Sequence, residues 1–231
     1  MIKYFKIIKY HGLLKGLRRS FDEFVEIDLF DFFNNVSTSK IKNINDYEKN
    51  KLFNSKVHKH YQPTYFSPLK KITLFIMKKI LYKKIIVVDL GTGYGKPLLI
   101  IGNVLKSLNN TQIKLIGIDL ENSFKKIFNQ NMNNFFTNSK NIKTKFENSK
   151  IEKFNFNFEE GEFCLIIHNK NSFSKEITLQ NINKIKKLKK TKKIQIFYIF
   201  SNPEFKNIFK KKKIFQTKGW HKNFNIDLFE I

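Results

Sequence analysis

Apolar and polar positions along the chain predict strands that alternate with helices. Short apolar runs indicate strands at residues 85–90, 114–119, 142–146, 163–167 and 194–200. Between them, apolar residues recur at helical spacing in segments 69–80, 98–104 and 124–128, and again from residue 177. Residues 214–217 and 226–231 favour a closing antiparallel pair. This order predicts an α/β fold with a largely parallel sheet.

Two segments precede this pattern. Residues 1–20 are basic and amphipathic, and we expect them to pack on the domain as a helix; the alternative is a helix that binds a membrane surface or a partner. Residues 21–33 mix acids with aromatics, and we expect them to fold back as a cap. The predicted division is an N-terminal helical extension, residues 1–60, and one domain, residues 61–231.

The strand predicted at 85–90 ends in a glycine-rich turn. Gly91, Gly93 and Gly95 follow it directly, and Pro97 stands where the first turn of a helix begins. This sequence of strand, turn and helix is typical of a nucleotide or phosphate cradle. Glycines let the ligand approach the backbone, and the helix N-terminus offers free N–H groups.

Two carboxylates flank this cradle in the sequence. Asp89 precedes the first glycine by two residues, where it would repel a pyrophosphate but suit a ligand with a positive charge. Asp119 ends the next strand and can accept hydrogen bonds from ribose hydroxyls. The glycine spacing G-x-G-x-G differs from the dinucleotide pattern G-x-G-x-x-G, which disfavours an NAD-dependent enzyme.

The segments VVDLGTGYGK, residues 87–96, and IGID, residues 116–119, resemble the first two motifs of class I S-adenosylmethionine-dependent methyltransferases. The resemblance implies an α/β, Rossmann-like, doubly wound seven-stranded sheet with a C-terminal antiparallel hairpin, and S-adenosylmethionine as the cofactor. It places Asp89 near the amino group of the cofactor's methionine part and Asp119 on its ribose. The loop residues that it places along the cofactor are Gly91, Thr92, Gly93 and Gly95.

Three more residues match cofactor-binding positions of this family. Tyr61 and Thr64 lie in a Y-x-P-T segment similar to one that covers the cofactor in small bacterial methyltransferases; for Tyr61 a packing role is the alternative. Asn148 follows the third predicted strand, where many class I enzymes have an acid that accepts from the adenine amine. Its amide carbonyl can also accept a hydrogen bond.

The methyl acceptor is expected at the exit of the fourth predicted strand, because ligand and reaction partner meet beyond the carboxyl ends of parallel strands. Asn169 with Phe173 resembles the spacing in non-SET lysine methyltransferases of chromatin, whereas Lys170 departs from the N-P-F of small bacterial relatives. The resemblance implies that Asn169 and Phe173 are catalytic in methyl transfer to an amino nitrogen of a protein lysine. The alternative for Asn169 is a loop asparagine bonded to its own backbone.

Composition raises a second hypothesis. The chain carries a formal net charge of +25 and 44 basic residues, among which Arg18 and Arg19 are the only arginines. Lysine, phenylalanine, isoleucine and asparagine are abundant and alanine is absent, which indicates an A/T-rich genome. Arginine forks for specific base contacts are missing, but a basic surface still attracts polyanions. A catalytically inert relative of the fold that binds nucleic acid through its lysine faces is therefore the alternative.

The cysteine, the histidines and the length of the apolar runs restrict the class of protein further. The single cysteine, Cys164, lies in an apolar run and excludes an internal disulfide. The five histidines are scattered, so we expect no metal site. No apolar run approaches the ~20 residues of a membrane span, and the N-terminus does not resemble a signal peptide. We therefore expect a cytoplasmic enzyme.

Overall fold

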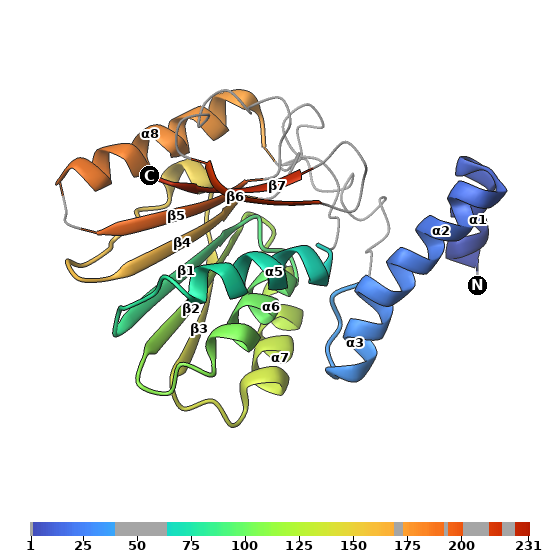
Figure 1. Ribbon diagram of the computed structural model, residues 1–231, viewed down its shortest axis with the longest axis horizontal. Coiled ribbons are helices and arrows are strands. Elements are labelled where there is room, and N and C mark those ends of the chain that lie inside the picture. Colours follow the sequence, from blue (N-terminus) through green and yellow to red (C-terminus); the bar gives the residue numbers. More distant parts are fainter. Residues whose placement is uncertain (1, 40–63, 169–172, 192–193, 201–212, 219–224) are drawn as a thin grey trace.

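A computed structural model describes residues 2–39, 64–168, 173–191, 194–200, 213–218 and 225–231 (Figure 1). Within them, seven strands form one sheet in the order β3-β2-β1-β4-β5-β7-β6. Strand β7 runs antiparallel to β5 and β6, and the other pairs are parallel. The strands are β1 (Lys84–Leu90), β2 (Gln112–Asp119), β3 (Ile142–Asn148), β4 (Phe163–His168), β5 (Gln195–Phe200), β6 (Lys213–Lys218) and β7 (Asn225–Glu230). The predicted Rossmann-like seven-stranded fold is confirmed.

Helices cover both faces of the sheet, and a helical extension precedes them. Figure 1 shows α5, α6 and α7 on one side of the sheet and α8 on the other. The α-helices are α1 (Ile2–His11), α2 (Leu13–Glu23), α3 (Leu29–Phe33), α5 (Phe66–Met77), α6 (Lys96–Leu105), α7 (Phe124–Phe136) and α8 (Lys175–Thr191). A π-helix, η1 (Phe24–Asp28), joins α2 to α3, and a single 3-10 turn, η2 (Ile151–Lys153), follows β3.

Two apolar layers hold the sheet between the helices. Val87 of β1 belongs to the layer that includes α5, α6 and α7, and its neighbour Val88 belongs to the layer on the α8 side. Both residues are fully buried, which explains why the central strands are continuous apolar runs rather than alternating ones. Phe156 and Phe158 extend the α8 layer after η2, where the link from β3 to β4 has no longer helix.

Three predicted boundaries were wrong. Helix α7 extends beyond the predicted segment 124–128 to Phe136, because Asn131, Met132 and Phe136 fall on its buried side. Helix α8 continues to Thr191 instead of ending in a basic turn. His168 belongs to β4 rather than to its exit loop. The helical turns expected within residues 43–56 and 205–209 lie outside the described residues.

Residues 24–39, here called the strap, lie against the sheet domain. The carboxylate of Glu26 accepts hydrogen bonds from the backbone N–H of Ser67, at 2.8 Å, and from its hydroxyl. Helix α5 begins at Phe66, so Ser67 lies in its first turn, and Glu26 satisfies a free N–H there. Phe30 packs against Phe66 and Phe135, with ring centroids 5.5 and 6.3 Å apart.

Helices α1 and α2, here called the arm, pack on each other. Gly16 of α2 lies against the backbone of Ile8 in α1, and the Ser20 hydroxyl donates to the carbonyl of Tyr4. Leu13 and Leu17, which were expected to pack on the domain, are 67% and 49% exposed. The expectation that residues 1–20 bury their apolar positions on the domain was therefore wrong.

The strap contacts predict a contrast between two phenylalanines of α3. Phe30 is 7% exposed in the core and Phe32 is 78% exposed. We expect Phe30→Ala to lower the free energy of unfolding by about 3 kcal/mol, because it leaves a cavity against Phe66 and Phe135. The control Phe32→Ala should stay within about 0.5 kcal/mol of the parent in urea denaturation. Equal effects of the two substitutions would show that the strap does not contribute to the core in solution.

Candidate functional site

The carboxyl ends of the parallel strands bring the expected site residues to one edge of the sheet. Asp89 lies level with Gly117 of β2 and with Ile167 of β4. Asp119 pairs with Asn148 across β2 and β3. The glycine loop, residues 91–95, leaves this same edge and leads into α6. The residues predicted for the cofactor from β1, β2 and β3 are thus gathered at one place, as the topology requires.

The glycine loop is tied to β2 by its own backbone. The N–H groups of Gly91 and Thr92 both donate to the carbonyl of Ile118, at 2.9 and 3.0 Å, and the N–H of Gly93 donates to the carboxylate of Asp119 at 2.9 Å. Gly95 has a left-handed φ of 87°, and a β-carbon there would collide with Met132 and Phe128. Glycine is therefore required at position 95 both by conformation and by space.

Asp89 is a fully buried carboxyl group. Among the described residues, neither of its oxygens has a hydrogen-bond partner, and the hydroxyl oxygen of Thr92 is likewise unsatisfied. Burial raises the pKa of Asp89 to about 7; the nearby Thr92 hydroxyl lowers that pKa and the charge of Asp119 raises it. The site therefore offers a buried acceptor that is half ionised near neutral pH and lacks a donor.

Asp119 is half-buried and already holds backbone donors. One carboxylate oxygen accepts from Gly93 and the other from the N–H of Glu121, at 3.0 Å. Burial raises the pKa of Asp119 to about 6, although these backbone hydrogen bonds lower it. Each oxygen of a carboxylate has a second lone pair, so Asp119 retains acceptor capacity for a pair of hydroxyls.

Asn148 is exposed and oriented by the turn that follows β2. Its side-chain NH₂ donates to the carbonyls of Asp119, at 3.1 Å, and of Leu120, at 2.9 Å. Both donors of the amide are thereby used, which leaves its carbonyl oxygen as the group available to a ligand. This is the atom that the sequence argument requires for contact with an adenine amine.

The remaining predicted residues are described only in part. Thr64 is half-buried just before α5, whereas Tyr61 and Asn169 lie outside the described residues. Phe173 lies edge-on to the ring of His168, with ring centroids 5.1 Å apart. In the described part of the chain, no group of three or more His, Cys, Asp or Glu side chains is arranged to hold a metal ion.

His168 was not selected by the sequence analysis. It is buried at the end of β4, where its Nδ1 lies 2.6 Å from the hydroxyl of Tyr198 and its Nε2 lies 3.5 Å from the hydroxyl of Thr178. Burial lowers the pKa of His168 to about 3, so its ring is neutral at physiological pH. The sequence signal that could have identified His168 as a site residue was its position at the end of an apolar strand, immediately before Asn169.

Asn131 was also missed. Its amide donates to the carbonyl of Tyr94 in the glycine loop, at 3.0 Å, and to the carbonyl of Ser37 in the strap, at 3.1 Å. Its oxygen accepts from the N–H of Ser37 at 2.8 Å. Asn131 lies three residues after Phe128, so helical spacing placed it on the buried face of α7. A single buried amide thus links the loop, α7 and the strap.

The raised pKa of Asp89 predicts a specific pH dependence of stability. Below its unfolded value of 3.8, Asp89 is protonated in both the folded and unfolded states, so its burial costs little. Between pH 3.8 and about 7 the unfolded chain ionises Asp89 while the folded protein keeps it protonated, so stability falls across this range and levels off above it.

We therefore expect Asp89→Asn to raise the free energy of unfolding at pH 8 by a few kcal/mol, because each tenfold change in the acid dissociation constant on folding corresponds to about 1.4 kcal/mol. At pH 5 the gain should be much smaller. Urea denaturation of both proteins at the two pH values measures the difference and cancels the titration of other groups. The exposed Glu160→Gln serves as the control. A gain that is the same at both pH values would contradict the burial of an ionisable Asp89.

Among known proteins, the chain is similar to distant solved structures. No family model and no curated protein matches the chain. A structure described as a class I S-adenosylmethionine-dependent methyltransferase from Listeria monocytogenes is 12% identical, with a TM-score of 0.49, over 73% of this chain and 60% of that one. A ribosomal protein L11 methylase from Lactobacillus delbrueckii subsp. bulgaricus is 10% identical, with a TM-score of 0.43, over 71% of this chain and 77% of that one.

A small RNA methyltransferase structure is 16% identical, with a TM-score of 0.45, over 66% of this chain and 19% of that one. The chain thus spans less than two thirds of the Listeria structure and about a fifth of the RNA methyltransferase. The fold itself rests on the strand order, which is the Rossmann-like seven-stranded order with an antiparallel β7 that the sequence resemblance implied.

Proposed function

We propose that this protein is an S-adenosylmethionine-dependent methyltransferase. The observation that carries the proposal is the buried carboxyl group of Asp89, which lacks a hydrogen-bond donor among the described residues and lies next to the glycine loop. An ammonium group is the partner that satisfies both the charge and the acceptors of such a carboxylate. The amino group of the methionine part of S-adenosylmethionine is of this kind.

The other site residues fit the rest of the same ligand. Asp119 retains acceptor capacity for the two ribose hydroxyls, and the carbonyl of Asn148 can accept from the adenine amine. The loop from Gly91 to Gly95 allows the ligand to approach its backbone closely. Tyr61 and Thr64 are proposed to cover the cofactor, on the sequence resemblance alone.

When bound, S-adenosylmethionine supplies a methyl group on a sulfonium sulfur. The protein's part in the transfer is to align the acceptor nitrogen with that carbon and to exclude water. Transfer to an amine would form an N–C bond while the S–C bond breaks and its electron pair stays on sulfur. An acceptor amine must lose its proton to solvent first, and burial beside a sulfonium charge lowers its pKa.

We propose a protein lysine as the acceptor, oriented by Asn169 beyond β4. The carbonyl of a neutral asparagine can accept from the remaining N–H groups of the amine and direct its lone pair at the methyl group. Phe173, packed on the neutral ring of His168, is proposed to line the slot for the lysine side chain. The neutral His168 ring adds no positive charge next to the acceptor amine. A protonated histidine at this position would repel the positively charged sulfonium of the cofactor.

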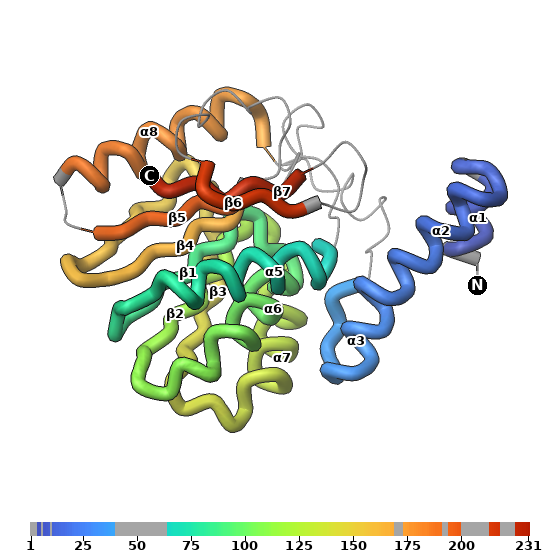
Figure 2. Tube along the Cα trace, in the orientation of Figure 1, coloured from blue at the N-terminus to red at the C-terminus, as the bar shows by residue number. Residues whose placement is uncertain are grey.

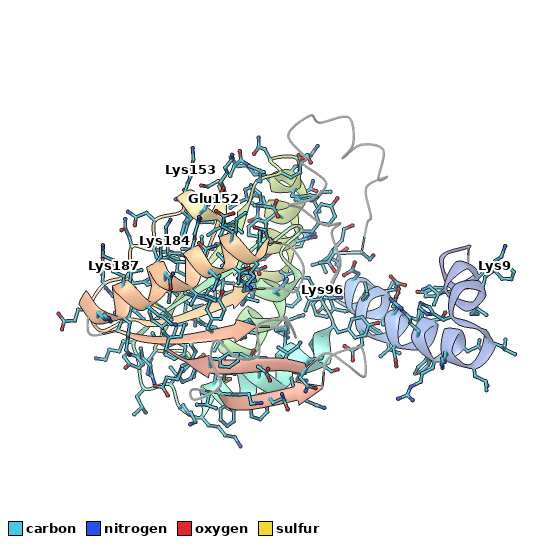
Figure 3. The ribbon with its side chains drawn as sticks, turned by 90° about the horizontal axis from the view of Figure 1, so that it is seen from above. Lys9, Lys96, Glu152, Lys153, Lys184 and Lys187 are labelled. Atoms are coloured by element: carbon cyan, nitrogen blue, oxygen red, sulfur yellow. The ribbon has the colours of Figure 1, made fainter. Side chains whose placement is uncertain are left out.

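The alternative is an inert protein that binds nucleic acid through its lysines. Two lysines of α8 speak against this alternative, because they bind backbone carbonyls of the protein itself. Lys184 donates to the backbone carbonyl of Glu152, and Lys189 donates to that of Ile194. Figure 3 shows Lys184 and Glu152 on the same side of the molecule as Lys153 and Lys187. Two lysines of this helix are therefore used inside the fold. Polyanion binding should also collapse with added salt, whereas cofactor binding should hardly change.

The proposed cofactor contacts predict distinct effects of the two acids. Asp119→Ala should weaken binding of S-adenosylhomocysteine about 10-fold or more, because a hydrogen bond to a charged group contributes roughly 1.5–3 kcal/mol. Asp89→Asn should weaken the binding of S-adenosylhomocysteine. It should not weaken the binding of 5′-methylthioadenosine, which lacks the ammonium group of the amino-acid part. Isothermal titration calorimetry measures both ligands, with NAD as the control ligand and Glu160→Gln as the control variant. If both acid variants bind S-adenosylhomocysteine as tightly as the parent, the ligand does not bind at this edge of the sheet.

The same contact predicts that S-adenosylhomocysteine binds more tightly as the pH rises from 6 to 8. The ligand's ammonium group pairs with ionised Asp89, whose pKa without ligand is about 7, so binding below that pH must release a proton. In Asp89→Asn this part of the pH dependence should disappear. Titrations in two buffers of different ionisation enthalpy count the released protons. A parent protein that releases none at pH 6 would contradict the pairing.

The acceptor role predicts a loss of turnover without a loss of cofactor affinity. Asn169→Ala should lower kcat on the order of 10²-fold, as removal of one well-placed polar group in a preorganised site does. Asn171→Ala, in the same segment, is the matched control. Phe173→Ala should instead raise the KM for the acceptor. A screen of lysate with methyl-labelled cofactor identifies the acceptor first, and robust turnover by Asn169→Ala on it would remove this residue from the mechanism.

A further inference from the structure

Helix α2 and the first residue of η1 present an apolar face that the described residues leave open. The large apolar side chains on it are 42–82% exposed. They are Leu13, Leu14, Leu17, Phe21 and Phe24. Their spacing of three and four residues places them on one side of the helix. In Figures 1 and 2 the arm stands away from the sheet domain.

A neighbouring side of α2 is already occupied by α1. Gly16 allows the backbone of Ile8 to approach closely, and Ser20 donates to the carbonyl of Tyr4. Arg19 connects the two helices through His11, at 2.6 Å, and also pairs with Glu23. The arm is therefore a helical hairpin with internal contacts, and its open apolar face is not the side that holds it together.

Charge is distributed unevenly between the arm and the strap. Residues 1–20 contain six lysines and arginines and no acid. Lys9, Lys15 and Arg18 are exposed, and Figure 3 shows Lys9 on the part of the arm far from Lys96. Two acids follow at the end of α2: Glu23 pairs with Arg19, and Asp22 lies four residues after Arg18. The acids of the strap bind internal partners: Glu26 binds Ser67, Asp28 binds Tyr4 and Asp31 binds Thr38. The surface next to the open apolar face is thus basic.

We propose that the arm binds the surface of an anionic lipid membrane, with α2 lying in the plane of the interface. No helix in the described part of the chain is long and apolar enough to span a bilayer, so the proposal concerns a helix on the membrane and not through it. Such helices have an apolar face with aromatic and leucine residues and a lysine- and arginine-rich polar side, and they sink about 5–10 Å into the headgroup region.

The basic charge of the arm favours an anionic lipid surface as its partner. Leu14, Leu17 and Phe21 supply the apolar area, while Lys15 and Arg18 reach the lipid phosphates at its border. Long basic side chains can keep their charge in water while their stems lie along apolar surface. A protein partner with an apolar groove would not by itself account for an arm with six basic residues and two acids, of which Lys9, Lys15 and Arg18 are exposed. The proposal is independent of the methyl transfer proposed above.

Sedimentation of the full chain with lipid vesicles tests the proposal. We expect binding to phosphatidylcholine vesicles that contain phosphatidylglycerol and little binding to phosphatidylcholine alone. The double variant Leu14→Gln/Phe21→Gln keeps good helix formers and should lose at least about tenfold in partitioning, because two apolar side chains no longer enter the interface. Its control is Leu81→Gln, which removes an apolar side chain that is 95% exposed elsewhere on the protein.

Charge is tested separately from apolar area. Lys15→Gln/Arg18→Gln should weaken binding to the anionic vesicles about fivefold for each charge removed, whereas Lys125→Gln/Lys126→Gln on α7 should not. Circular dichroism and S-adenosylhomocysteine titration confirm that each variant is folded. Equal binding to both kinds of vesicle, or unchanged binding by Leu14→Gln/Phe21→Gln, would overturn the proposal. A parent dimer that this variant converts to monomer, without lipid binding, would assign the face to a second copy of the chain.

Discussion

The burial of the Asp89 carboxyl group, which has no hydrogen-bond partner in the part of the chain that the structure describes, is the constraint that gives the site its character. The N–H groups nearest in sequence do not relieve it: those of Gly91 and Thr92 donate to Ile118, and that of Gly93 donates to Asp119. The fold thus uses the donors of the glycine loop to hold the loop against β2 and leaves the adjacent carboxyl group unsatisfied. An unsatisfied buried group costs stability, which is reasonable at a ligand site and difficult to explain elsewhere.

The loop is also held from the side opposite β2. Asn131 in α7 binds the carbonyl of Tyr94, and the fully buried Lys96, at the start of α6, donates to the carbonyl of Glu26 at 2.8 Å. The ammonium group of Lys96 lies 4.8 Å from the ring centroid of Phe30. Strand β2, helix α7 and the strap therefore fix the loop together, which preorganises its backbone for a ligand.

Much of this arrangement could be predicted because it is encoded locally. The strand at 85–90, the glycine loop and the acids Asp89 and Asp119 lie within one short segment and its neighbour, and parallel topology determines where their ends meet. The sequence could not show that Glu26 caps α5 or that Asn131 binds Ser37, because these partners are 41 and 94 residues apart. Long-range polar pairs have no periodicity to detect.

Periodicity also failed to show what lies against an apolar face. The spacing of Leu13, Leu17 and Phe21 predicts an amphipathic helix but cannot distinguish a face buried on the domain from one left exposed. The large apolar residues of α2 are exposed, whereas Ile27 of η1 and Phe30 of α3 are buried against the domain. Phe32 and Phe33 of α3 are exposed again, so burial changes from residue to residue along this run.

The charges also differ along this run. Before η1 the exposed basic residues include Lys9, Lys15 and Arg18. Glu26, Asp28 and Asp31, by contrast, are acids bonded to groups within the fold. One helical run is therefore anchored beside the glycine loop at one end and carries an open, basic, apolar surface at the other. Because Glu26 binds both Ser67 and Lys96, the position of that surface is mechanically coupled to the start of α5 and α6.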